Sequence, residues 1–496
     1  MDCPSRRYAS RDRIAFQASR TDRRQFLMQG AAALVGLGVH EDSRRRAVAN
    51  VPRFRVPLPI PPVLAALRVD ASGDYYEIAQ REGVTEIIPG VRTRIWGYNA
   101  SFPGPTIRAR RGRPTIVTHT NNLGIPTVVH LHGGVTRPES DGFPTDTLSP
   151  GETRRYEYSN IGRAATLWYH DHSRAGTGRN LYMGLAGLYL LEDDAEVTGQ
   201  LPHGRFDIPL IIQDRALTDD GQLDYDHHGH HGATGSIMLV NGAPWPVFEV
   251  SARKYRFRIL NASNAMDLRL ALSPAQPLTQ IAVDQGLLPR PVSLRTVALT
   301  MGERVEIVID FSRYAVGSRV VLHNVRGEGP LSRVMRFDVV RAERDDSIVP
   351  LVLSEFETLS AADAVETRTF VFGGRLTLGI PPAVQWLING EPFDPMRVDA
   401  TPRFGDIEIW RFVNQGFLGR SMVHPVHTHL APFQVVRRNG RAPLREEGGW
   451  KDTVAVDDGE EVDVAIRWSG YRGRYLLHCH NLEHEDHTMM TRVDVI

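Results

Sequence analysis

The chain has 496 residues, of which 23% are charged and 42% are hydrophobic. This composition is ordinary for a folded protein and excludes a largely disordered chain. Basic and acidic residues balance at 58 each, so the overall charge gives no indication of a nucleic-acid partner. At roughly 150 residues per domain, the length predicts about three domains. Against this background, 2 cysteines and 19 histidines stand out.

Residues 1–49 have the features of an export signal. Arg23 and Arg24 precede a weakly apolar stretch from Gly30 to Val39, which is too short to span a bilayer because a span needs about 20 apolar residues. Ala47-Val48-Ala49 then suits signal cleavage before Asn50. The segment resembles a twin-arginine export signal; the alternative is a disordered basic tail. We therefore expect the twin-arginine export machinery as a partner, and a mature chain that is periplasmic or secreted and does not span the membrane.

Downstream of this segment, short alternating runs predict an all-β fold. Examples are Arg256–Leu260, Val305–Ile309 and Glu461–Ile466. Turns rich in Gly, Pro, Asn and Asp separate such runs, which is typical of β-sandwiches or barrels.

An internal repeat divides the chain into three parts. Three alternating runs each end on an asparagine, and a second asparagine in a predicted turn lies some 20 to 25 residues upstream of each. The run-ending residues are Asn121, Asn261 and Asn414, and the turn residues are Asn99, Asn241 and Asn389. One sandwich unit used three times predicts domains at 50–197, 198–348 and 349–496.

The histidines are clustered. Chance predicts roughly 0.7 His-x-His pairs for this composition, whereas pairs occur at 130/132, 170/172, 228/230, 427/429 and 478/480. Residues two apart on a strand point to the same face, so each pair offers two imidazoles to one site. Imidazole suits copper, zinc and iron.

The segment around Cys479 is the most informative. On a strand, His478 and His480 face one way while Cys479 faces the other, so Cys479 belongs to a different metal from its neighbours. His484 and Met489 follow it, and two His, a Cys and a weak axial Met are the ligands of a blue-copper site. His424 is the candidate for the second His. The alternatives are structural histidines in a β core and a zinc site, but structural zinc usually draws on several cysteines.

These residues resemble the multicopper oxidases over essentially the whole mature chain. The flanks are most similar to three-domain bacterial members, a group with spore-coat laccases and periplasmic cuprous oxidases. The segments that carry the resemblance are Val129–Val135, Gly449–Thr453 and His478–Asp486. The resemblance implies three cupredoxin-like Greek-key domains and four copper ions, one of type 1, one of type 2 and two of type 3.

The resemblance also implies a role for each residue. The type 1 copper takes His424, Cys479 and His484, with Met489 axial, and the type 2 copper takes His130 and His427. The type 3 pair takes His132, His170, His172, His429, His478 and His480. Domain 2, which carries no copper signature, is expected to act as a spacer. Asp141 and Glu485 sit where the family places proton-donating acids; the alternative for each is a solvated loop carboxylate.

The expected reaction couples one-electron oxidation of a small-molecule donor to reduction of dioxygen to water. Cuprous oxidases of this family often carry a Met-rich insert, but only Met396 and Met422 lie between Asn389 and His424. This favours a laccase-like enzyme acting on phenols or aromatic amines; a periplasmic cuprous oxidase that accepts Cu(I) is the alternative. A non-enzymatic scaffold or copper-storage protein is a second alternative. The His227–His231 cluster is either an extra copper-binding loop or a polar surface loop.

Overall fold

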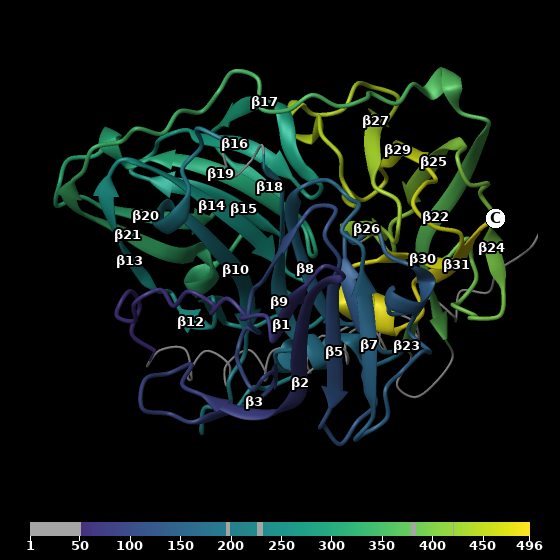
Figure 1. Ribbon diagram of the computed structural model, residues 1–496, viewed down its shortest axis with the longest axis horizontal. Coiled ribbons are helices and arrows are strands. Elements are labelled where there is room, and N and C mark those ends of the chain that lie inside the picture. The colour runs from purple at the N-terminus through teal and green to yellow at the C-terminus, as the bar shows by residue number, and fades with distance from the viewer. Residues whose placement is uncertain (1–50, 195–198, 226–231, 378–382, 420) are drawn as a thin grey trace, which may run out of the picture. The chain divides into compact units, whose positions relative to one another are not determined.

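The computed structural model describes residues 51–194, 199–225, 232–377, 383–419 and 421–496 (Figure 1). The predicted export signal and the His227–His231 cluster therefore lie outside the described residues. Residues 51–496 form one compact unit. Its described part consists mostly of strands in six sheets, which confirms the predicted all-β class with cupredoxin-like sandwiches. The domain boundaries at 197/198 and 348/349 stay predictions.

The strands up to β9 form two sheets, here called the first sheet pair. One sheet contains β1 (Arg68–Asp70), β2 (Gly73–Thr85), β3 (Thr93–Tyr98), β5 (Thr115–Asn121) and β7 (Thr153–Tyr158). The other contains β4 (Ile107–Arg110), β6 (Val129–His132), β8 (Ala165–Asp171) and β9 (Ala186–Glu192). Buried aliphatic and aromatic side chains from both sheets form one core, as expected when the apolar faces of two sheets pack together.

The strands from β10 to β21 form the middle sheet pair, drawn in teal in Figure 1. One sheet contains β10 (Asp207–Arg215), β11 (Ile237–Val240), β12 (Ala243–Pro244), β14 (Lys254–Asn261), β16 (Leu278–Val283), β17 (Gly286–Leu294) and β19 (Arg304–Asp310). The other contains β13 (Val247–Ala252), β15 (Leu268–Ser273), β18 (Val297–Leu299), β20 (Arg319–Asn324) and β21 (Arg333–Ala342). The rings of Phe257 and Phe337, one from each sheet, lie 5.2 Å apart.

The strands from β22 to β31 form the last sheet pair. One sheet contains β22 (Glu366–Thr377), β23 (Ala383–Ile388), β25 (Ile407–Asn414), β27 (Phe433–Arg438) and β29 (Glu461–Arg467). The other contains β24 (Val398–Ala400), β26 (His424–Thr428), β28 (Thr453–Val456), β30 (Gly473–Cys479) and β31 (Met490–Val495). Cys479 and Met489 belong to the apolar core between them.

The three alternating runs quoted from the sequence lie in β14, β19 and β29. Alternation usually leaves one strand face in water, yet all of β14 after Lys254 is buried. The burial of its polar residues Arg256 and Arg258 is compensated by ion pairs with Glu306 of β19. The polar face of β14 is thus buried, and its arginines form a charged layer with Glu306 inside the protein.

The repeated asparagines make equivalent hydrogen bonds in all three sheet pairs. Asn99, Asn241 and Asn389 have φ values of 56°, 51° and 54°, a left-handed conformation that asparagine tolerates better than most residues. The Oδ1 atom of each accepts a backbone N–H, from Ala79, Ile211 and Val371 respectively. The repeat read from the sequence is therefore a repeated sheet corner.

Helices are short and few among the described residues. The α-helices are α2 (Thr177–Met183) and α4 (Leu482–Asp486). The 3-10 helices are η1 (Pro138–Ser140), η2 (Gly204–Phe206), η3 (Phe311–Arg313), η4 (Gly329–Ser332), η5 (Ala361–Asp363) and η6 (Arg445–Glu447). None of the described helices is long and apolar enough to cross a bilayer.

Candidate metal centre

Cys479 lies at the end of β30 in a group with two histidines. Its Sγ atom is 3.5 Å from His424 Nδ1 and 3.7 Å from His484 Nδ1, and the two Nδ1 atoms are 3.3 Å apart. All three side chains are buried. Ligand bonds of about 2.0–2.3 Å to nitrogen and sulfur fit such a triangle, so one metal ion can contact all three atoms.

Met489 and Trp386 complete the surroundings of this triangle. The Met489 carbonyl accepts the Cys479 N–H at 3.1 Å, and the Met489 N–H donates to the His484 carbonyl at 2.9 Å. The Trp386 ring packs against the His484 ring with centroids 4.0 Å apart. The segment between α4 and β31 thus brings the backbone of Met489 to the Cys479 group, and its role as a metal ligand stays a prediction.

A second, all-histidine group lies where the first and last sheet pairs meet. Its eight members come from the ends of β6, β8, β26 and β30 and are all buried. They are His130, His132, His170, His172, His427, His429, His478 and His480. All eight predicted residues are therefore brought together, four from each side.

Within this cluster, five of the rings point Nε2 at one another. The Nε2 atoms of His172 and His429 lie 3.3 and 3.2 Å from that of His478. The Nε2 atoms of His130 and His427 lie 3.5 Å apart. In four of these rings Nδ1 has a partner outside the cluster: for example, His427 Nδ1 lies 2.8 Å from the Asp452 carbonyl. Such outer contacts fix the tautomer and leave Nε2 for a metal.

His132, His170 and His480 form the remaining part of the cluster. Their ring centroids are 5.0 to 5.7 Å apart. Among the described residues, His132 Nδ1, His170 Nε2 and both nitrogens of His480 have no hydrogen-bond partner. Buried nitrogens without partners are costly, and a metal ion would satisfy them.

Cys479 connects the two groups covalently. Its side chain joins His424 and His484, while the His478 ring joins His172 and His429 and the His480 ring lies beside His132. The opposite orientation predicted from strand geometry is thus present. The covalent path from Cys479 to the histidine cluster is therefore a single peptide bond long, toward His478 on one side and toward His480 on the other.

The two predicted acids both lie at the histidine cluster. Asp141 Oδ2 accepts from His429 Nδ1 at 2.7 Å, and its Oδ1 accepts from the Thr136 hydroxyl at 3.1 Å. Glu485 lies 3.2 Å from His478 Nδ1 and 3.6 Å from His172 Nε2. Both carboxyl groups are fully buried, so neither is a solvated loop acid.

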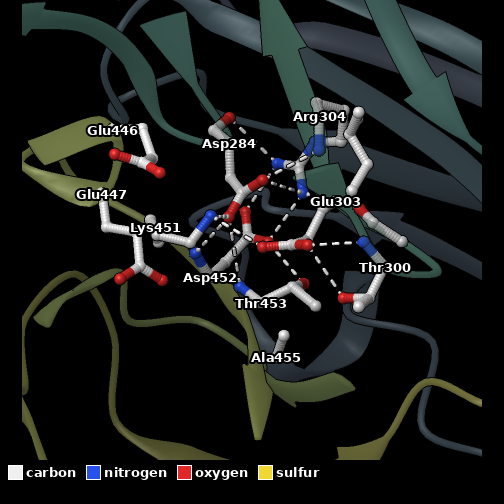
Figure 2. A network of polar contacts seen from close by, with 12 residues as sticks. Asp284, Thr300, Glu303, Arg304, Glu446, Glu447, Lys451, Asp452, Thr453 and Ala455 are labelled. Carbon is white, nitrogen blue, oxygen red and sulfur yellow. Dashed lines mark hydrogen bonds and ion pairs between the residues drawn. The ribbon is translucent and has the colours of Figure 1, made fainter. Parts of the chain in front are cut away.

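A third carboxylate at the cluster was missed from the sequence. Asp452 Oδ1 lies 3.0 Å from His132 Nε2 and is also bound by Arg304 of β19 (Figure 2). In the sequence, Asp452 stands out only as part of the Gly449–Thr453 segment that carries the family resemblance. Because Arg304 is 148 residues away in the chain and has no motif around it, the sequence gives no signal for the pair. The middle sheet pair is therefore more than a spacer.

Burial sets the protonation of these groups. It lowers the pKa of His424 and His480 to about 3 and lowers the pKa of the histidines at 130, 132, 170, 172, 427 and 429 as well. Burial also raises the pKa of the Cys479 thiol. Neutral imidazoles are ready to bind a metal ion, and a bound metal deprotonates a thiol.

The pKa values of the two predicted acids, Asp141 and Glu485, shift in opposite directions. Burial raises the pKa of Asp141, against opposing contributions from His130 and the Thr136 hydroxyl. For Glu485, burial acts in the same direction, but the neighbouring His172 and His478 outweigh it and the pKa is lowered.

Comparisons with known proteins agree with this geometry. Two family models described as multicopper oxidase match residues 81–196 and 365–496. A laccase of Bacillus subtilis is 35% identical, with 89% of this chain and 98% of the laccase covered. The chain belongs to the multicopper oxidase family. A bilirubin oxidase of Albifimbria verrucaria is 36% identical, with 88% of this chain and 80% of that protein covered.

A solved multicopper oxidase structure extends the likeness to the fold. The crystal structure of a laccase from Pediococcus acidilactici superposes with a TM-score of 0.83 at 32% identity, covering 90% of this chain and 95% of that one. Membership of the multicopper oxidases makes the protein a copper-dependent oxidoreductase, with an electron donor and dioxygen as its substrates. The two buried groups of His and Cys fit copper, because imidazole and thiolate are ligands that copper accepts.

Proposed function

We propose that this multicopper oxidase is laccase-like and oxidises phenols or aromatic amines one electron at a time. The observation that carries the proposal is the pairing of a His-Cys-His group with a separate cluster of eight histidines, joined through Cys479. A donor site and an oxygen site that are separated in this way suit one-electron oxidation coupled to a four-electron reduction.

The proposed ligand sets follow the two groups. His424, Cys479 and His484 would hold a type 1 copper, with Met489 as a weak further ligand. His130 and His427 hold a type 2 copper. The type 3 pair is held by His132, His170 and His480 on one side and by His172, His429 and His478 on the other. When bound, these four copper ions supply one-electron redox chemistry at Cys479 and reduction of dioxygen to water at the cluster.

The residues of the chain then have distinct tasks. Cys479 and its peptide neighbours His478 and His480 provide a short covalent path for electrons from the donor side to the oxygen side. Asp141 delivers protons, since reduction of dioxygen to water consumes them. Its contact with His429 and its raised pKa support this role, because a proton donor must hold a proton and lie within hydrogen-bond reach or one water of its target. Glu485 lies beside His478 and has a pKa that His172 and His478 lower, so its part is to pass protons on as an anion and not to store one.

The choice of donor rests on methionine. Soft thioethers bind Cu(I), yet the segment before His424 has only Met396, which is exposed, and Met422, which packs on the core. No methionine-rich segment is present in the sequence to collect Cu(I). The likeness to a laccase, at 35% identity, supports the same choice, although a bilirubin oxidase at 36% identity shows that the donor varies within the family.

We also propose that the chain is exported in the folded state by the twin-arginine route, so that it works in the periplasm or outside the cell. The support is the sequence of residues 1–49 alone. Replacing Arg23 and Arg24 with lysine is expected to retain the protein in the cytoplasm, which fractionation of cells measures. Unchanged export of this variant would contradict the proposal.

Oxygen uptake by copper-loaded protein tests the donor. We expect uptake with a phenol and an aromatic amine to exceed uptake with Cu(I), together with a blue absorption band from the Cys479 site. A strong preference for Cu(I) would replace the laccase-like activity with a cuprous oxidase. Bound copper without uptake from any donor would instead indicate a scaffold or storage protein.

A further inference from the structure

A cluster of buried charges lies between the middle and last sheet pairs (Figure 2), and its Asp452 contacts His132. Asp284 follows β16, Glu303 and Arg304 lie at the start of β19, and Lys451 and Asp452 precede β28. The side chains of Asp284 and Arg304 are completely buried. Two cations face three carboxylates here, and Lys451 Nζ contacts both Asp284 and Glu303, at 2.9 and 3.0 Å.

Arg304 uses its whole guanidinium group in this cluster. Nε donates to the Thr166 carbonyl of β8, while Nη1 and Nη2 also donate to the carbonyls of Gly302 and Asp284. The same two nitrogens donate to Asp452 Oδ1 at 2.7 Å and Oδ2 at 2.6 Å. All five N–H donors of an arginine are thereby used, and one side chain connects all three sheet pairs.

Asp452, held in place by Arg304, in turn contacts His132, a predicted copper ligand. Its Oδ1 lies 3.0 Å from His132 Nε2, and the Thr453 hydroxyl lies 3.1 Å from the same nitrogen. The other oxygen, Oδ2, accepts from Gln285 Nε2 at 2.5 Å, and Gln285 also donates to the carbonyl of Gly133, the residue after His132. Side chain and backbone of this segment are therefore held by the same group.

The contact reverses the ring of His132 relative to its neighbour. The His132 and His427 rings are stacked, with centroids 3.7 Å apart and planes within 11°. His427 directs Nδ1 outward to the Asp452 carbonyl, whereas His132 directs Nε2 outward to the Asp452 side chain. The His132 nitrogen that has no hydrogen-bond partner within the described part of the chain is Nδ1.

We propose that Arg304 is a positioning residue for the oxygen-reducing site: by clamping Asp452, it fixes the His132 ring so that Nδ1, not Nε2, binds copper. This inference rests on the proposed function, since it assigns His132 to a copper ion. The geometry requires an arginine, because the ammonium group of lysine cannot make two parallel bonds to a carboxylate.

The close packing around the clamp supports this role. A Cβ atom on Gly133 would lie 2.6 Å from Asp452 Oδ2 and 2.7 Å from Arg304 Nη2, and one on Gly302 would lie 2.9 Å from the His480 ring. Both glycines have positive φ values, 81° and 82°. The backbone on both sides thus approaches the clamp so closely that no larger residue fits.

Copper retention by the Arg304→Gln variant tests the proposal. Copper-loaded protein is dialysed against increasing concentrations of a chelator, and copper per chain is measured by atomic absorption alongside the blue band. We expect 10- to 100-fold weaker retention of cluster copper, as is typical when a residue that orients a metal ligand is lost, with the blue band of the Cys479 site unchanged. The KM for dioxygen should rise while the KM for the donor stays the same.

Arg258→Gln is the matched control. Arg258 is also buried, also belongs to the middle sheet pair and also contacts Thr166, but its carboxylate partners are Asp207 and Glu306. We expect this variant to retain copper like the wild type. A folded Arg304→Gln protein with a wild-type chelator curve would overturn the proposal, as would an equal loss of copper from both variants.

A second variant covers the case in which Arg304→Gln does not fold. Asp452→Asn keeps the size of the side chain but removes the charge that Arg304 clamps, and it should show the same selective loss of cluster copper. Normal copper retention by folded Asp452→Asn would refute the clamp. If wild-type protein binds copper but oxidises no donor, the proposed function fails, while the chelator curves still decide the role of Arg304.

Discussion

Asp141 and Asp452 make the same contact on opposite sides of the histidine cluster. Asp141 follows η1 in the first sheet pair and contacts His429, which follows β26 of the last pair. Asp452 precedes β28 of the last pair and contacts His132, at the end of β6 in the first pair. The first and the last sheet pair thus each provide one buried carboxylate that contacts a histidine of the other pair.

The partners of the two carboxylates differ. Apart from histidines, Asp141 has the Thr136 hydroxyl as its side-chain donor among the described residues, and its pKa is raised because burial dominates. Burial also acts on Asp452, but the Arg304 guanidinium outweighs it, and the pKa of Asp452 is lowered. The same position beside a histidine therefore yields a carboxyl group that can accept a proton in one case and a fixed anion in the other.

This difference teaches how one cluster can separate two tasks. Proton transfer needs a group whose pKa lies near the working pH, whereas orientation of a ligand needs a group whose charge does not change. Because its partners are neutral, Asp141 can take part in proton transfer. Arg304 keeps Asp452 charged, so Asp452 orients a ligand.

The largest effect is expected from Cys479→Ser. This variant cuts the electron path to the histidine cluster at which Asp141 and Asp452 are compared. Loss of the thiolate should abolish the blue band and lower turnover below detection, because electrons no longer reach the cluster. Copper held by the eight histidines should remain. Visible absorption, oxygen uptake and copper per chain measure these three quantities, and loss of all copper would contradict the independence of the two groups.

Asp141→Asn should slow turnover by about 10²- to 10⁴-fold, the range typical of removing a general acid or base. Copper retention should not change, since the amide oxygen can still accept the hydrogen bond from His429. Oxygen uptake at saturating donor and dioxygen is compared with the chelator curve of the same protein. Weaker copper binding at normal turnover would show that Asp141 orients its histidine as Asp452 does.

A double-mutant cycle with Arg304→Gln and Asp452→Asn should show coupling of about 0.5–3 kcal/mol in copper affinity, as for residues of one network. The double variant is expected to be hardly worse than either single variant. The cycle of Arg304→Gln with Asp141→Asn should be additive, because the two residues share no contact in the described structure. Additive effects on copper affinity in the first cycle would show that Arg304 and Asp452 act independently.

The smallest effect is expected from Thr136→Val. This change removes a neutral hydrogen bond to Asp141 at nearly constant volume, which costs about 1 kcal/mol and changes turnover by less than about tenfold. Urea unfolding and steady-state kinetics measure the two values. A loss of turnover as large as that of Asp141→Asn would mean that Thr136 itself takes part in proton transfer.

The sequence predicts the local part of this structure well. Strand alternation predicts β14, β19 and β29, the upstream asparagines predict turns, and His-x-His spacing predicts pairs of histidines on one face of a strand. The opposite orientation of Cys479 and its neighbours follows directly from strand geometry. Each of these inferences depends on residues close together in the chain, where the period of a strand fixes which side chains share a face.

What the sequence does not reveal depends on contacts between distant strands. Arg304 looks like the first residue of an ordinary alternating strand, and Asp452 looks like a turn residue before β28. Similarly, Arg256 and Arg258 are typical of an exposed strand face, yet both are buried, and Thr166 of the first sheet pair contacts Arg258 and its partner Glu306. No local period encodes which surface covers a strand, so the charged layer and the clamp emerge only from the fold.

The five-donor environment of Arg304 has a consequence for the order of folding. Thr166 precedes it in the chain, but Asp452 is synthesised 148 residues later, so a nascent chain that ends near residue 342 holds a guanidinium group without its carboxylate. Domains generally fold as units, the N-terminal ones first, during synthesis. Arg304 can therefore use all five of its donors only after the last sheet pair has been synthesised.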